Sequence, residues 1–256
     1  MHNAGRQDPL GGENQNGSHP KLIDLRAFGL CLLCTAPIET RFSKCFACGH
    51  APANAIPDEA TFLSYAMNGL QSGTVARQYK DAFNSPGGDP RSRQDMQILL
   101  YLCMAKHVDC LLRVHAFERL GVTFVPSGSG RKEHPLEQHL FPYVQGPPVI
   151  DIHRTAPSRL EGRRDAGIDP GRYEIPSDVT DAHILVLDDT WTTGTQMMSV
   201  VAALRAAGAA RVTTLCIMRY LQREYPPTAG WLEEQGTLPK YSDDFCPVTR
   251  SFTCPR

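Results

Sequence analysis

The chain has 256 residues, 41% of them hydrophobic, which is enough to bury a full core. One α/β domain of roughly 170 to 190 residues with a small appendage is the natural division. The formal net charge of -1 argues against a broad basic surface for nucleic acid and leaves only a local patch open. The longest apolar run, Ile98 to Ala105, is too short to span a bilayer.

The first 20 residues are polar and rich in Gly and Asn, and they lack the apolar centre of a secretory signal. We therefore expect residues 1–24 to be a disordered tail. The same observation predicts a cytoplasmic protein with reduced thiols.

Two cysteine pairs follow the tail, Cys31-x-x-Cys34 and, ten residues later, Cys45-x-x-Cys48. Each pair can form a turn that presents two thiolates to one tetrahedral ion, so residues 25–52 are expected to be a four-cysteine zinc ribbon. Four ligands leave no open coordination position, and the zinc would be structural. A redox Cys-x-x-Cys or a disulfide is the competing interpretation, and His50 is an alternative ligand.

Residues 57–59 are a proline followed by two acids, a pattern typical of a helix start. It predicts a helix through residues 61–82, interrupted at Gly69 and Gly73. A second helical pattern runs over residues 91–120 and ends before Gly121.

The other cysteines show no ligand spacing. Cys103 and Cys110 lie seven residues apart on the second predicted helix and are interpreted as core residues. Cys246 and Cys254 lie in a polar C-terminal segment without a second pair. We therefore expect no second zinc site from the sequence.

A short strand is predicted over residues 122–125, followed by a small-residue loop and two cations. Such a loop offers exposed amides, and the cations would meet charge on an anionic leaving group. A flexible surface loop is the alternative. Its residues are Ser127, Gly128, Ser129, Gly130, Arg131 and Lys132. A strand at residues 149–153 follows.

The most informative segment is His183 to Ile217. A β-branched-rich run, Ile184 to Leu187, predicts a strand covered on both faces. Asp188 and Asp189 follow, and then a Thr/Gly turn and a helix through Ala206 with Gly208 as its cap. With the strand at residues 212–218 this forms a βαβ unit, which places the acids and the turn at the carboxyl edge of the sheet.

That arrangement suits a sugar phosphate. The amides at a helix N-terminus stabilise a phosphate, and Gly194 allows close approach of the backbone. Two carboxylates beside the turn favour ribose hydroxyls and Mg²⁺. Neither a Walker P-loop nor a dinucleotide fingerprint occurs in the chain. An ordinary strand-to-helix turn with solvated acids is the alternative.

The string DDTWTTGT resembles the phosphoribosyl pyrophosphate (PRPP) signature of the type I phosphoribosyltransferases. The resemblance implies that Asp188 and Asp189 hold the ribose hydroxyls and order magnesium. It also implies that the following turn wraps the 5-phosphate, with Gln196 departing from the usual Thr or Ser. The PRPP-binding positions of this turn are Thr190, Thr192, Thr193, Gly194, Thr195 and Gln196.

A zinc ribbon ahead of such a domain is similar to the ComF family, over about residues 25 to 221. The resemblance implies an open, mostly parallel α/β sheet in a phosphoribosyltransferase-like domain at residues 53–222. Residues 223–256 form a C-terminal extension of unknown role. Ser127 to Gly130 would then be the pyrophosphate loop, with Arg131 and Lys132 as catalytic cations beside the acid pair.

The implied activity is transfer of the phosphoribosyl group from PRPP to a nitrogen acceptor, with release of pyrophosphate. Thr192 stands where enzymes for 6-oxopurines typically have Asp, which disfavours that acceptor class. The alternative is a non-catalytic PRPP or nucleotide sensor, or a DNA-uptake-related interaction protein. A nucleic acid or protein partner of the ribbon and a homodimer stay open. For Trp191, base stacking, packing in the turn and covering the ribose are alternative roles.

Overall fold

The computed structural model describes residues 29–84, 89–113, 116–126, 136, 147–155, 167–236, 238 and 242–254, with backbone only at 80–84. The predicted tail and the loop from Ser127 to Lys132 lie outside these residues. Within the ranges described, no helix combines the length and apolar character needed to cross a bilayer.

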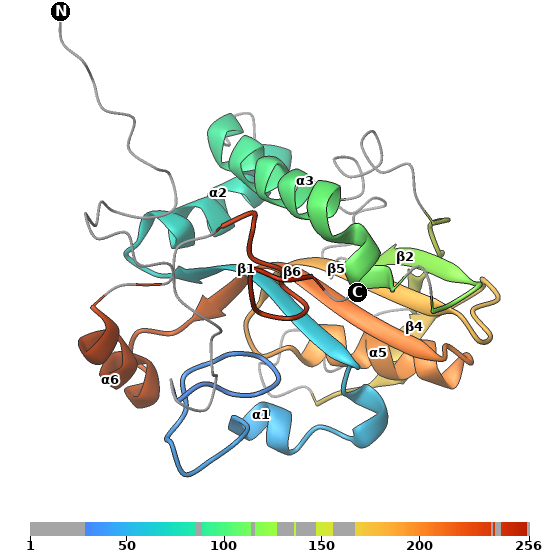
Figure 1. The fold of residues 1–256 in the computed structure, drawn as a ribbon, viewed down its shortest axis with the longest axis horizontal. Coiled ribbons are helices and arrows are strands. Elements are labelled where there is room, and N and C mark those ends of the chain that lie inside the picture. Colours follow the sequence, from blue (N-terminus) through green and yellow to red (C-terminus); the bar gives the residue numbers. More distant parts are fainter. Residues whose placement is uncertain are drawn as a thin grey trace, which may run out of the picture.

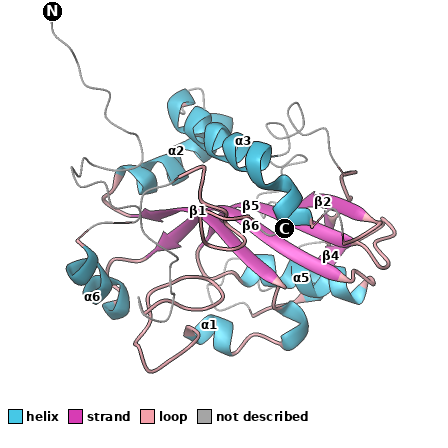
Figure 2. Ribbon diagram, in the orientation of Figure 1, coloured by secondary structure: helices cyan, strands magenta, loops and turns pink. Residues whose placement is uncertain are grey.

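A four-stranded parallel sheet forms the centre of the molecule (Figure 2). Its order is β1 (Glu59–Met67), β6 (Arg211–Leu221), β5 (His183–Trp191) and β2 (Leu120–Phe124). Val149 adds a parallel bridge beside Val122 at the β2 edge. The prediction of an α/β fold with an open parallel sheet is confirmed.

The first predicted helix is wrong over its N-terminal half, because residues 59–67 form strand β1. This segment pairs with β6 from Glu59↔Thr213 to Met67↔Leu221, and it is interior on much of both faces. Tertiary pairing therefore overrides a local helical pattern. The helix α2 begins only at Gln71, after Gly69 has turned the chain at φ +82°, and extends to Asn84.

The helix α3 (Pro90–Leu112) starts at Asp89, whose carboxylate accepts the N–H groups of Arg91 and Ser92. It ends eight residues earlier than the pattern predicts, because Arg113 adopts a left-handed conformation and β2 already begins at Leu120. Helices α2 and α3 cover one face of the sheet, and α5 (Thr195–Ala206) covers the other (Figure 1).

The predicted end of α5 is confirmed. Gly208 has φ +100°; its N–H bonds to Arg205, and the N–H of Ala209 bonds to Leu204. This pair of hydrogen bonds is a Schellman cap, which returns the chain to β6.

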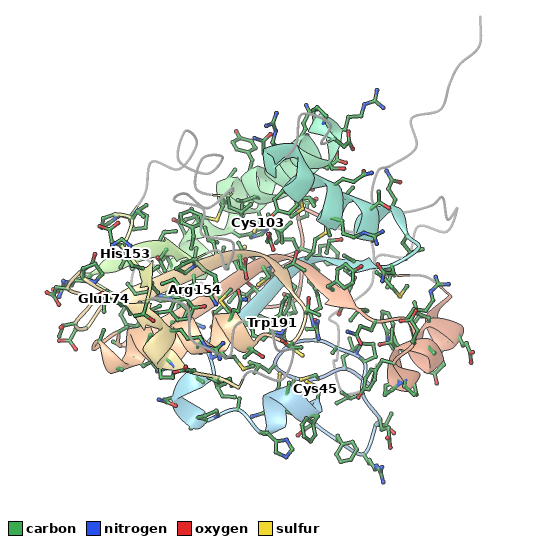
Figure 3. All side chains as sticks on the ribbon, turned by 180° about the vertical axis from the view of Figure 1, so that it is seen from behind. Cys45, Cys103, His153, Arg154, Glu174 and Trp191 are labelled. Atoms are coloured by element: carbon green, nitrogen blue, oxygen red, sulfur yellow. The ribbon has the colours of Figure 1, made fainter. Side chains whose placement is uncertain are left out.

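The alternating side chains of β5 separate two cores. Ile184 and Val186 join the core beneath α5, while Leu185 and Leu187 join the core beneath α2 and α3. Three cysteines of the N-terminal segment belong to the α5 core. Figure 3 accordingly shows Cys45 and Cys103 on opposite sides of the sheet.

Smaller elements complete the fold. The N-terminal segment holds α1 (Phe46–Gly49) and the 3₁₀ turn η1 (Ala53–Ala55). A two-stranded antiparallel ribbon joins β3 (His153–Arg154) to β4 (Tyr173–Glu174), with η2 (Pro170–Arg172) before β4. On α6 (Pro226–Gln235), Trp231 packs with Leu30 and Leu221.

Candidate functional site

The acid pair lies within strand β5. The strand continues to Trp191, and β6 pairs with it at Asp188↔Cys216 and Thr190↔Met218. The sequence pattern ended this strand at Leu187, but the long partner β6 also pairs with Asp188, Thr190 and Trp191. Because successive side chains of a strand point to opposite faces, the two carboxylates cannot face the same way.

Asp189 points toward helix α2. Its carboxylate is almost fully buried and accepts a hydrogen bond from the Tyr79 hydroxyl. Burial raises the pKa of Asp189 to about 7, and the neighbouring Thr190 dipoles offset this only in part. Near pH 7 the carboxyl group of Asp189 is therefore divided between its protonated and charged forms.

Asp188 is half-buried and lies on the opposite face, near Tyr173. Its Oδ1 accepts the N–H of Asp189 at 2.8 Å. Burial raises the pKa of Tyr173; the charge of Arg154 opposes this shift, and that of Asp188 adds to it. Asp188 is thus the more accessible acid of the pair.

The turn after the acids ends at Gly194, the N-cap of α5, which adopts a left-handed conformation at φ +82°. A glycine has no side chain to accept the first-turn amides of the helix, so these N–H groups and the positive end of the helix dipole face outward. Thr192 and Thr193 are exposed, and the hydroxyls of Thr193 and Thr195 lie 3.1 Å apart. Gln196 is exposed at the next position.

Trp191 forms the floor of this turn. It is 1% exposed and meets Phe62 edge-on, with ring centroids 5.5 Å apart. A Cβ on Gly194 would overlap the indole ring. The structure therefore assigns Trp191 to packing under the turn, and the stacking interpretation of this residue is wrong for the described conformation (Figure 3).

Arg219 holds the turn from below and was missed by sequence reasoning. Its buried guanidinium donates to the carbonyls of Trp191 and Thr192, both at 2.8 Å. The same group donates to the carbonyl of Cys34 at 2.7 Å and lies 3.5 Å from the Cys34 sulfur. One side chain thus connects the cysteine cluster to the turn.

The four N-terminal cysteines converge as the sequence predicts. Their sulfur atoms all lie within 4.8 Å of one another. In the first knuckle, Thr35 takes φ 53° and donates its N–H to the carbonyl of Cys31; in the second, Gly49 donates to the carbonyl of Cys45. The residues are Cys31, Cys34, Cys45 and Cys48.

This donor set fits zinc. Four sulfurs within 4.8 Å of one another suit a closed tetrahedral site, which leaves no open coordination position for substrate. A metal binds cysteine as thiolate, and a divalent ion at the centre of the cluster would balance this charge. The cluster could hold one structural zinc ion.

The second predicted anion loop, Ser127 to Lys132, lies outside the described residues, but the strand that precedes it is described. Val125 donates its N–H to the carbonyl of Leu187 at 3.0 Å. The last described residues before this loop therefore lie beside Leu187, the strand position that precedes Asp188.

Tyr79 was also missed as a partner of the site. It is 1% exposed and belongs to α2, more than one hundred residues before Asp189. A tyrosine in an amphipathic helix gives no local sign of a carboxylate partner, and only the packing of α2 on the sheet reveals it.

Comparisons with known proteins reveal distant structural similarity only. No protein-family model matches the chain, and no curated protein matches it by sequence. Among solved structures, a hypoxanthine phosphoribosyltransferase from Staphylococcus aureus has a TM-score of 0.32 and 13% identity, covering 52% of this chain and 76% of that one.

Two further solved structures are similar at the same level. A phosphoribosyltransferase from Corynebacterium diphtheriae has a TM-score of 0.31 and 18% identity, covering 59% of this chain and 95% of that one. A purine phosphoribosyltransferase from Pyrococcus horikoshii Ot3 has a TM-score of 0.29 and 15% identity, covering 49% and 87%.

Proposed function

We propose that the protein binds PRPP with magnesium and transfers its phosphoribosyl group to a nitrogen acceptor, releasing pyrophosphate. One observation carries the proposal: an acid pair and an uncapped helix N-terminus adjoin at the carboxyl edge of a parallel sheet. Ligands of open α/β sheets bind at this edge.

The turn from Thr192 to Gln196 would bind the 5-phosphate. Its amides supply donors without a basic side chain, and the hydroxyls of Thr193 and Thr195 add two more. Trp191 and Arg219 make this cradle rigid from below, so little ordering is needed on binding.

The two acids would have different roles. Asp188, the accessible acid, would accept hydrogen bonds from the ribose hydroxyls and help to order magnesium. Asp189 would add negative charge from beneath once a bound cation favours its ionised form. When bound, magnesium would balance charge on the diphosphate.

The bond from the anomeric carbon to pyrophosphate would break as the acceptor nitrogen bonds to that carbon. Arg131 and Lys132 would stabilise the leaving group, with the amides of residues 127–130 around it. This role follows from the family resemblance, and the position of Val125 beside Leu187 supports it.

The exposed Thr192 disfavours 6-oxopurines as the acceptor. Where a 6-oxopurine enzyme typically offers a carboxylate to the base, this chain has a neutral hydroxyl. We propose an amine or a pyrimidine-like base instead.

A PRPP sensor is the second candidate, and two observations favour it. Asp189 is already occupied by Tyr79, and the cysteine segment exposes two large apolar side chains, Phe42 and Phe46, suited to a partner. Pyrophosphate release across a panel of amines and bases separates the two candidates: binding without release supports the sensor.

Titration calorimetry with PRPP and magnesium tests the shared claim. We expect Asp188→Asn combined with Asp189→Asn to abolish measurable binding. Asp181→Asn is the matched control, because Asp181 is exposed at the opposite end of β5 and its left-handed backbone suits asparagine. Unchanged affinity in the double variant would refute the proposed site.

A further inference from the structure

A second set of metal-ligating side chains gathers on the opposite face of the sheet from the cysteine cluster at residues 31–48. One ligand atom from each of its four members lies within 4.8 Å of the others. Two members come from α3 and two from the C-terminal segment, residues 242–254. They are His107, Cys110, Cys246 and Cys254.

The helical pair is well placed for chelation. His107 and Cys110 are three residues apart on α3, so their side chains lie on the same face of the helix. Both are buried, His107 with 3% of its surface exposed. A histidine in such a position needs polar partners on both ring nitrogens.

Both ring nitrogens of His107 have partners. Nε2 lies 3.0 Å from the carbonyl oxygen of Asp243, which accepts its proton, while Nδ1 lies 3.5 Å from the sulfur of Cys254. This is the usual arrangement of a metal-bound histidine, in which a carbonyl fixes the tautomer and the other nitrogen is free to coordinate.

The C-terminal segment folds around Cys246, which is fully buried. Cys246 accepts the N–H of Arg250 and donates its own N–H to Ser251, closing a tight turn in which Arg250 has φ 54°. This turn presents the sulfur of Cys246 to the ligands on α3, much as each N-terminal knuckle presents its sulfurs to the other knuckle.

Charge holds the same segment against the helix. Lys106 forms ion pairs with Asp243 at 2.6 Å and with Asp244 at 2.8 Å. These pairs are partly exposed to water, so each contributes little to stability. They help to position the segment, whose apolar contacts in the described residues include the edge-on pair Phe245–Phe252 and Val248 against the core beneath α2 and α3.

We propose that His107, Cys110, Cys246 and Cys254 bind a second structural zinc ion, which fastens the C-terminal segment to α3. Three sulfurs and one imidazole nitrogen form a closed tetrahedral donor set, and thiolate with imidazole selects zinc over magnesium or calcium. The positive charge of the ion balances the charge of the buried thiolates. The free energy of zinc binding stabilises the folded conformation of the C-terminal segment.

Zinc content of the full-length protein, purified under reducing conditions, tests the proposal. We expect two zinc ions per chain in the wild type and one in Cys254→Ser, which is chosen because Cys254 is the exposed member of the set. Cys103→Ser is the matched control, because Cys103 is a buried cysteine of the same helix outside the cluster, and it should keep both ions.

A variant-free measurement covers the case in which substitutions fail to fold. Iodoacetamide labelling of the wild type, read by peptide mass spectrometry, should modify the exposed Cys254 at least tenfold more slowly with Zn²⁺ bound than after chelation. Equal labelling rates would overturn the proposal. So would a single zinc ion per wild-type chain, or an intact mass under reducing conditions showing a disulfide between two of these cysteines.

Discussion

At the scale of single residues, Gly194 and Trp191 determine the shape of the turn. Gly194 combines a left-handed backbone with an indole ring where its Cβ would be. Position 194 therefore requires glycine for both a conformational and a steric reason. The sequence motif alone does not reveal that Trp191 packs under the turn or that Arg219 binds its carbonyl groups.

Gly194→Ala is expected to lower the free energy of unfolding and to weaken PRPP binding. Gly69→Ala is the matched control, because Gly69 has the same φ of +82° with nothing near its Cβ. The control should lose about 1–2 kcal/mol from backbone strain, and Gly194→Ala about 1–3 kcal/mol more from overlap with Trp191. Equal losses in denaturant titrations would contradict the steric role of the indole.

Asp189 predicts a pH dependence of stability. Its folded pKa of about 7 lies above the ordinary value of 3.8, so the folded state keeps a proton that the unfolded state releases. The contribution of this group is fully present below about pH 4 and is lost as the pH rises to about 7, by at most about 4 kcal/mol.

Asp189→Asn should remove this loss. Relative to wild type, the variant should gain stability steadily between pH 4 and pH 7 in urea titrations, whereas Asp181→Asn should show no such trend. A constant difference over that range would mean that Asp189 is ionised in the folded protein.

At the scale of elements, the sequence predicts the βαβ unit from β5 to β6 well and the segment that forms β1 poorly. In the unit, a buried run, a cap glycine and a helical period all agree. In β1, the segment EATFLSYAM has no clear alternation, and only pairing with β6, about 150 residues later, makes it a strand. Local periodicity cannot reveal such a distant partner.

Close packing between β1 and α2 gives a prediction for Gly73. A Cβ at this position would overlap the backbone carbonyl of Met67 at the end of β1. Gly73→Ala should therefore destabilise the protein by about 1–3 kcal/mol despite the better helix propensity of alanine.

Gly230→Ala in α6 is the control, because open space surrounds its Cβ. It should be neutral or stabilising by up to about 1 kcal/mol. If thermal denaturation ranks the two variants the other way, α2 does not lie against β1 as described.

At the scale of the whole molecule, metal-ligating clusters lie on both faces of one sheet, one at α1 and the other at α3, which Figure 1 shows on opposite faces. The first was predictable because its ligands are close in sequence and local turns build each knuckle. The second was not, because His107 and Cys254 are 147 residues apart and neither shows a pair motif. Sequence reasoning therefore did not predict that these four side chains come together.

Arg219 gives the first cluster a connection to the proposed ligand site. Arg219→Lys retains the charge but cannot reach Cys34, Trp191 and Thr192 together, since lysine lacks the planar fork. We expect weaker PRPP binding and faster zinc loss to a chelator in this variant. Arg41→Lys, on the exposed surface of the cysteine segment, should alter neither. A change in only one property would show that the two sites are independent.

The most direct measurement is a crystal structure of the protein with PRPP and magnesium. The account predicts the 5-phosphate on the amides of Thr192 to Gln196, with the ribose hydroxyls facing Asp188. An empty turn at saturating PRPP, or a phosphate bound elsewhere, would contradict it.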